Sequence, residues 1–241
     1  KIERIDFYIK TKRAMIFINY ILYIVYILVW IWFPSSRMNY CCFFLLNSVI
    51  YFPRTNLPLN IFEERYLDLV NDSFRNDKLM GMVQSKRENS LVYRVGCLGK
   101  ISDYQETSDG RVLINLTGIT RFEITKEIVS KKKYREFEVD YEKFNKDLVI
   151  PSKIEAVYDK FNFMEKVKKF FEKNGLVINW KEFEKLDDSQ KINTLSMIAP
   201  ISNEEKQKLL ETVTLEDKTN TLLNIIKFYS YDHPFDKETI Q

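Results

Sequence analysis

FLLNSVIYFPRTNLPLNIFEERY, residues 44–66, is the stretch that decides the fold of this 241-residue chain. Its first part is a short apolar run that Pro53 closes, a pattern typical of a buried strand. From Leu57 the spacing of apolar residues changes to that of a helix, with Asn60 as the expected N-cap and Glu63 and Glu64 in the first turn. The apolar face of that helix would consist of Ile61, Tyr66, Leu67, Val70 and Phe74.

From there to about residue 150 the pattern is mostly that of strands. Asp109-Gly110 lies between two β-rich runs and carries the signal of a hairpin turn. The run after it alternates, with one face made by Val112, Ile114 and Leu116. A later run alternates in the same way, with one face made by Phe137, Val139 and Tyr141.

After Pro151 the spacing is helical throughout. A long helix is predicted over Lys153–Lys173, with Asn174-Gly175 as its C-cap pair. Its apolar stripe would consist of Ile154, Val157, Phe161, Met164, Val167 and Phe171. Shorter helices are predicted over 180–186 and 189–198, and a capping box at Ser202–Glu205 opens another. Thr214-x-x-Asp217 opens the last helix, whose inward face would consist of Leu215, Leu222, Leu223, Ile226 and Tyr229.

Strands followed by helices predict an α+β chain. We expect a β-rich part at 41–150, a helical part at 151–231 and a polar tail at 232–241. Residues 1–40 form a separate appendage, because they hold six basic and two acidic residues and leave the rest of the chain at a net charge of −1.

The appendage contains an uncharged run from Ala14 to Pro34, which has the length of a membrane-spanning helix. Trp30 and Trp32 at one end and a basic cluster at the other fit an anchor. The segment is also rich in Ile, Tyr, Phe and Asn, and the chain begins at Lys1, so an over-extended start before Met38 is the other interpretation. We therefore expect a cytoplasmic protein, with membrane anchoring through Ala14–Pro34 as the alternative.

The composition excludes several classes of protein and site. With 45% hydrophobic and 29% charged residues the chain is globular, not disordered. The chain has three Cys, which form no CxxC pair, and one His. We therefore expect neither a disulfide framework nor a metal site. The net charge of +3 comes from the appendage, so a nucleic-acid partner is not expected.

The sequence holds no recognisable catalytic motif. Walker-type GxxxxGKS/T, GxGxxG, GxSxG and HExxH patterns are absent, and no cofactor is expected. The carboxylate pairs fall at predicted helix starts, where capping explains them, and Cys97 is expected to be a small core residue. These observations predict a binding module and not an enzyme.

Residues 44–66 resemble the opening of the Lon protease N-terminal, or substrate-binding, domain. Pro58–Tyr66 (PLNIFEERY) matches the family pattern throughout. The match continues through Val95-Gly96, the Asp109-Gly110 turn and Leu116–Phe122, and covers about Phe43 to Tyr229. The helical remainder is similar to small stand-alone bacterial members, which carry neither the ATPase nor the protease module of full-length Lon.

The resemblance implies a six-stranded, PUA-like β-barrel followed by a helical bundle. The family-motif residues, with mainly structural roles, would be Pro58, Leu59, Ile61, Phe62, Glu63, Arg65, Tyr66, Gly96, Gly118, Arg121 and Phe122. Ile61 and Phe62 would plug the barrel, Glu63 or Arg65 would tie the following helix to strands, and Gly118 would end a strand at a bend.

The function that the resemblance implies is non-catalytic recognition of protein or unfolded polypeptide segments, linked to ATP-dependent proteolysis. Binding could use an open sheet edge or an apolar groove between the two parts, and the sequence does not choose. An RNA- or small-ligand-binding module of the PUA-like kind is the alternative, and a hydrolase with an unrecognised site is a third hypothesis.

Overall fold

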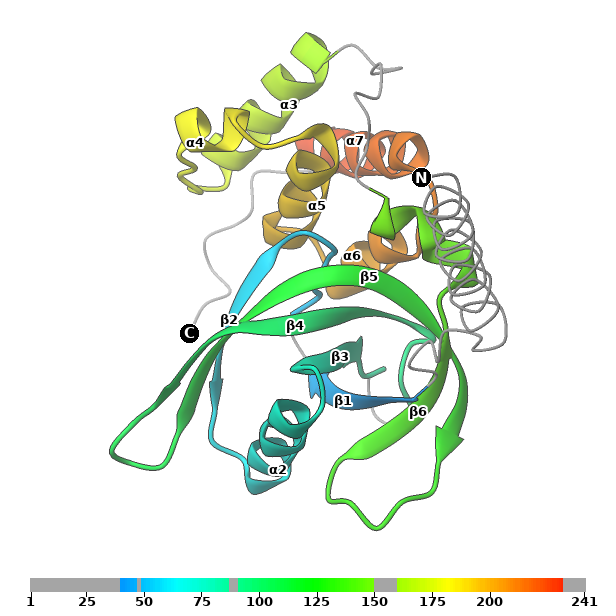
Figure 1. Ribbon diagram of the computed structural model, residues 1–241. Coiled ribbons are helices and arrows are strands. Elements are labelled where there is room, and N and C mark those ends of the chain that lie inside the picture. The colour runs from blue at the N-terminus through cyan, green and yellow to red at the C-terminus, as the bar shows by residue number, and fades with distance from the viewer. Residues whose placement is uncertain (1–39, 47–48, 87–90, 150–159, 232–241) are drawn as a thin grey trace, which may run out of the picture. The chain divides into compact units, whose positions relative to one another are not determined.

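The computed structural model describes residues 40–46, 49–86, 91–149 and 160–231 (Figure 1). The chain divides into two compact units, Lys1–Asn39 and Tyr40–Gln241, and only the second contains described residues. The uncharged run from Ala14 to Pro34 and the polar tail therefore lie outside the described residues, as does the start of the predicted Lys153–Lys173 helix.

Six strands form one mixed sheet. They are β1 (Tyr40–Leu46), β2 (Asn56–Ile61), β3 (Leu79–Gln84), β4 (Val95–Glu106), β5 (Val112–Ile128) and β6 (Arg135–Asp140). Their order is β2-β5-β4-β3-β1-β6; β1 and β3 are parallel, and the other pairs are antiparallel.

The long strand β5 organises this sheet. Its first half pairs with β2 and β4, and its second half pairs with β6, which also pairs with β1. The pairings do not establish the closed six-stranded barrel that the resemblance implies, because β2 pairs with β5 alone among the described strands.

The predicted hairpin and the alternation of apolar residues are confirmed. Asp109-Gly110 joins β4 to β5, and Gly110 has a φ of 81°, which glycine adopts without strain. Val112, Ile114 and Leu116 are buried, as are Phe137, Val139 and Tyr141, because every second residue of these runs faces the core.

The prediction for residues 57–63 is wrong. Leu57–Ile61 belongs to strand β2, and helix α2 (Glu64–Arg75) begins only after Glu63, so Asn60 is not its N-cap. Leu57 and Ile61 are buried while Asn56, Pro58 and Asn60 are exposed. This alternation has the period of a strand, and pairing with β5 satisfies it.

The helical part contains the predicted elements. After η1 (Glu142–Leu148) come α3 (Lys160–Lys173), α4 (Trp180–Glu184), α5 (Asp188–Ile198), α6 (Asn203–Glu211) and α7 (Leu215–Tyr231). The capping box at Ser202 and Glu205 is confirmed, and the Thr214 side chain accepts a hydrogen bond from the amide of Asp217 at 3.1 Å.

One of the three buried clusters of the described residues joins the helices to β4 and to the loop before β2. Ile50, Phe52 and Val95 pack in the same buried cluster as residues of the helices, which include Phe163, Val167, Phe171, Ile192, Leu209 and Leu222. One detail of the predicted stripe on α3 is wrong: Phe161 is 80% exposed, and Phe163 and Phe170 are buried instead. Helix α6 packs against β4, whereas α2 packs against β1 and β3 (Figure 1).

Candidate functional site

A cavity of about 400 Å³ lies at the junction between the sheet and the helices. We call it the junction cavity. Its wall includes the loop residues Pro53 and Arg54, Arg121 of β5, Asp147 of η1, Asn193 of α5 and Lys218 of α7. Segments distant in sequence therefore meet at this cavity, and two of its cationic side chains, those of Arg121 and Lys218, are buried.

Arg121 forms an ion pair with Asp147 beside the cavity. Its Nε and Nη2 atoms each donate to a different carboxylate oxygen of Asp147 at 2.8 Å, and its backbone amide donates to the same carboxylate at 3.0 Å. The guanidinium also stacks on the ring of Phe144 at 4.3 Å. A bidentate pair of this kind fixes orientation as well as charge, so η1 is held against β5.

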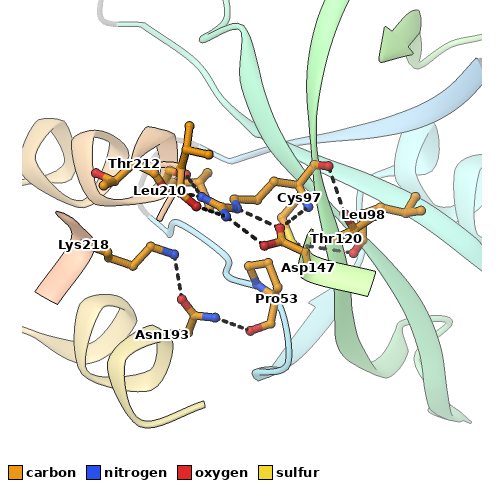
Figure 2. A network of polar contacts seen from close by, with 11 residues as sticks. Pro53, Cys97, Leu98, Thr120, Asp147, Asn193, Leu210, Thr212 and Lys218 are labelled. Carbon is orange, nitrogen blue, oxygen red and sulfur yellow. Dashed lines mark hydrogen bonds and ion pairs between the residues drawn. The ribbon is translucent and has the colours of Figure 1, made fainter. Parts of the chain in front are cut away.

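The same guanidinium binds the chain at the end of α6. Nη1 donates to the carbonyl oxygens of Leu210, at 3.0 Å, and Thr212, and Nη2 donates to that of Val213 at 3.3 Å. Figure 2 shows the partners Asp147, Leu210 and Thr212 gathered in this network. A cation here satisfies carbonyl groups that a helix end leaves without partners. Arg121 thus links the sheet to the helical part.

Lys218 is the second buried cation of the network. It is 3% exposed, and its Nζ donates to Asn193 Oδ1 at 2.8 Å, while Asn193 Nδ2 donates to the Pro53 carbonyl at 3.0 Å (Figure 2). The ammonium also lies 5.3 Å from the centre of the Phe52 ring. Burial, together with the nearby positive charge of Arg121, lowers the pKa of Lys218 to about 7.

Cys97 lies on β4 behind this network and is fully buried. Burial raises the pKa of its thiol well above the ordinary value, and the carboxylate of Asp147 acts in the same direction. A thiol held in its neutral form is a poor nucleophile, so its environment is that of a core residue, as expected.

The residues of the Pro58–Tyr66 motif lie away from Arg121. Pro58, Leu59 and Ile61 belong to β2, and of these Ile61 is buried, as predicted. Phe62 is 64% exposed and plugs nothing, because the chain leaves the sheet at this residue. Tyr66 is buried and packs α2 against the sheet.

Glu63 and Arg65 do not tie α2 to the strands as predicted. They pair with each other at 2.7 Å on the surface. The contact between α2 and the β5–β6 connection is made instead by Lys133, which pairs with Glu64 at 2.5 Å and Asp68 at 3.5 Å. Lys132 of the same basic run pairs with Asp72 and Glu136, so carboxylates accompany these lysines.

Gly118 lies within β5 and does not end it. A Cβ atom at this position would lie 2.3 Å from the carbonyl oxygen of Phe52. The close approach lets Gly118 exchange backbone hydrogen bonds with Arg54 and Thr55, each at 2.9 Å. This glycine therefore positions the loop that forms one wall of the junction cavity.

Gly96 has a similar packing role on β4. A Cβ atom there would lie 2.5 Å from the Met82 carbonyl oxygen and 2.5 Å from the ring of Phe122, which is fully buried. Of the predicted family-motif residues, the structure brings Arg121 to the junction cavity and Gly118 to the loop beside it. Ile61, Tyr66, Gly96 and Phe122 pack within the sheet or between it and α2, whereas Phe62, Glu63 and Arg65 lie at the surface.

Sequence reasoning missed Lys218, Asn193, Asp147 and Arg54. One signal was present: Lys218 lies three residues after Leu215 and four before Leu222, on the face that the same pattern assigns to the core. A lysine at an inward position of an amphipathic helix indicates a buried charge. The partners of Lys218 and Arg121 come from loops and helices distant in sequence, which no local pattern connects.

Within the described part of the chain, no group of three or more His, Cys, Asp or Glu side chains could hold a metal ion. Among these same residues there is also no helix of sufficient length and hydropathy to cross a bilayer.

The family model, the curated relatives and the solved structures all indicate the same protein family. A family model described as the ATP-dependent protease La (LON) substrate-binding domain matches residues 39–227. Lon protease 1 of Hydrogenovibrio crunogenus is 23% identical over 193 residues, which are 76% of this chain and 23% of that protein. Lon protease of Malacoplasma penetrans is 26% identical and is matched over 24% of its length. The chain thus spans about a quarter of the length of these curated relatives.

Solved structures show the same fold. A Lon N-terminal domain protein from Xanthomonas campestris has a TM-score of 0.58 at 19% identity, covering 77% of this chain and 97% of that one. The N-terminal domain of Mycobacterium avium complex Lon protease has a TM-score of 0.56 at 15% identity, covering 78% and 98%. The family match covers the strands β1–β6 and the helices α2–α6 completely, and so the chain belongs to the Lon substrate-binding domain family.

Proposed function

We propose that this chain is a substrate-recognition module, which binds unfolded segments of proteins destined for Lon-type ATP-dependent proteolysis and does not itself catalyse a reaction. The observation that carries the proposal is the extent of the family match, because residues 39–227 include both the sheet and nearly all of the helical part. The matched region corresponds to about a quarter of the length of the Lon proteases to which the chain is similar.

The chemistry of the described residues supports a non-catalytic role. The Cys97 thiol is buried and neutral, and the Asp147 carboxylate is engaged through both oxygens by Arg121. Catalytic groups instead have side chains that are free to reach a substrate. The free thiol also fits a reducing compartment, and the cytoplasm is our proposal for the location.

Two surfaces support binding of a polypeptide. The outer edge of β2 has no further strand beside it among the described residues, and Phe62, 64% exposed, follows it directly. Leu113, 39% exposed, lies opposite Asn60 in the register with β5. An extended segment could add to this edge through backbone hydrogen bonds, with its side chains on Phe62 and Leu113. The junction cavity is the second surface.

A peptide array probed with the full chain tests the proposal. Peptides tiled from unfolded substrates should be enriched over scrambled versions of the same composition. Phe62→Ser and Leu113→Ser should reduce this enrichment if the β2 edge is used, whereas the exposed Phe228→Ser on α7 serves as a matched control. Equal retention of tiled and scrambled peptides would contradict the proposal.

The alternative of an RNA-binding module gains no support from the charges. The basic run 131–133 is the feature that would favour it, but Lys132 and Lys133 are paired with carboxylates of α2 and β6. Neutralised lysines release few counterions on binding RNA. Retention of RNA that falls steeply with salt would favour this alternative.

A further inference from the structure

The Lys218 ammonium is buried, and no carboxylate of the described residues pairs with it. Among the described residues its hydrogen-bond acceptor is the neutral amide oxygen of Asn193, and an ammonium can donate three hydrogen bonds. Asp147, which lines the same cavity, is already held by Arg121. A buried cation is stable when an anion accompanies it, so the site lacks one negative charge.

Arg54 is a second residue of the cavity wall whose side chain has a hydrogen-bond donor available. Its Nη2 pairs with Asp187 at 2.6 Å, but its Nη1 is buried and has no hydrogen-bond partner in the described part of the chain. Its backbone has a φ of 61°, an unfavourable value for a residue with a side chain, and the Gly118 carbonyl holds it through a 2.9 Å hydrogen bond. The fold thus holds this arginine in a strained conformation at the cavity wall.

The rest of the lining fits an anion with an apolar part. The lining holds four cationic residues (Arg54, Arg121, Lys146 and Lys218) and two acidic ones (Asp147 and Glu216), and Lys146 and Glu216 are exposed. Apolar walls come from Pro53, Val149, Val213 and Leu215. The volume of about 400 Å³ is within the range of small-molecule sites.

We propose that the junction cavity binds a carboxylate with a short apolar side chain, held by Lys218 Nζ and Arg54 Nη1. The C-terminal residue of a polypeptide has this chemistry, and so does a free carboxylic acid. The polypeptide source rests on the proposed function, whereas binding of the carboxylate does not depend on it.

The binding should take up a proton near neutral pH. Burial lowers the pKa of Lys218, Arg121 on β5 adds to this, and Asp147 on η1 and Cys97 on β4 oppose it. A bound carboxylate would favour the charged form of Lys218, so the affinity should fall between pH 6 and pH 9.

Calorimetric titration of the full chain with N-acetyl-leucine and with N-acetyl-leucine amide tests the inference. The acid should bind about tenfold more tightly than the amide, since one charge-assisted contact is lost in the amide. Lys218→Met, which retains the length of the side chain, and Arg54→Gln should each remove most of this preference. Lys208→Met, an exposed residue of α6, should leave it unchanged.

The inference would be overturned if the acid and the amide bind with equal affinity or if neither binds. It would also be overturned if both Lys218→Met and Arg54→Gln keep the preference for the acid. Peptides with free and amidated C-termini then separate the sources. If the acid binds and the free peptide end does not, the occupant is a free carboxylic acid. If unfolded polypeptides bind equally well to the wild type and to the Lys218→Met and Arg54→Gln variants, the proposed function stands and its binding site lies outside the junction cavity.

Discussion

Arg121 connects three parts of the molecule through one guanidinium. It holds Asp147 of η1, the carbonyl groups after α6 and its own strand β5, while it is only 3% exposed. Because each partner is a buried polar group, removing the guanidinium leaves several of them unsatisfied at once.

We therefore expect Arg121→Met to lower the free energy of unfolding by about 3–5 kcal/mol, because the Asp147 carboxylate would lose its counter-charge. Urea denaturation of the wild type and variant measures this. The double variant Arg121→Met/Asp147→Leu should be less destabilised than the single one, since it buries no unpaired charge. Additive losses would show that the ion pair does not contribute as argued.

Lys218 should make stability depend on pH in a defined window. Its pKa is about 7 in the folded chain and near 10.5 when unfolded, so between these values the unfolded chain binds the extra proton. Stability of the wild type relative to Lys218→Met should therefore rise from pH 7 to pH 10, by on the order of a few kcal/mol. Below pH 7 the difference should be constant. Denaturation curves at pH 6, 8 and 10 measure it, and a constant difference throughout would contradict burial of the ammonium.

Gly118 should not tolerate a side chain. Gly118→Ala places a Cβ atom against the Phe52 carbonyl, so the loop at residues 52–55 must shift, with an expected loss of at least about 2 kcal/mol in urea denaturation. Gly110→Asn is the control, because nothing lies within 4 Å of its Cβ position and Asn tolerates a positive φ. A near-neutral Gly118→Ala would contradict the close approach.

At the scale of elements, the helices of the C-terminal part could be predicted because their ends carry local signals. The capping boxes, the Asn174-Gly175 end and the Asp109-Gly110 turn all depend on residues within a few positions of one another. The prediction for residues 57–63 was wrong for the opposite reason. Leu57 and Ile61 fit both a helical and a strand period, and only the pairing with β5 decides between them.

The cap of α6 offers a test at this scale. The Ser202 hydroxyl accepts a hydrogen bond from the Glu205 amide at 3.2 Å, and Ser202→Ala removes it at a cost of about 1 kcal/mol. Ser230→Ala on α7 is a matched control, since its hydroxyl only donates to the carbonyl four residues earlier. Thermal denaturation should show a lower Tm for the first variant, and an equal Tm for both would contradict the role of the cap.

At the scale of the whole molecule, one buried cluster joins the helical part to β4 and the loop before β2, and no single segment predicts this contact. Phe52 and Val95 pack among helical residues, and the junction cavity lies where the loop at residues 53–54 meets α5 and α7. The sequence alone indicates the family motif, which includes Arg121, but it does not indicate the partners of Arg121. These come together only when the chain has folded, because Asp147, Asn193 and Lys218 belong to three different elements.

The central claim is that the chain recognises unfolded polypeptide. Titration of the full chain with a fluorescently labelled protein that is held unfolded by reduction and carboxymethylation, compared with the same protein in its native state, tests this most directly. Saturable binding of the unfolded form and none of the native form is the predicted result. Failure to bind the unfolded form, or equal binding of both forms, would contradict the claim.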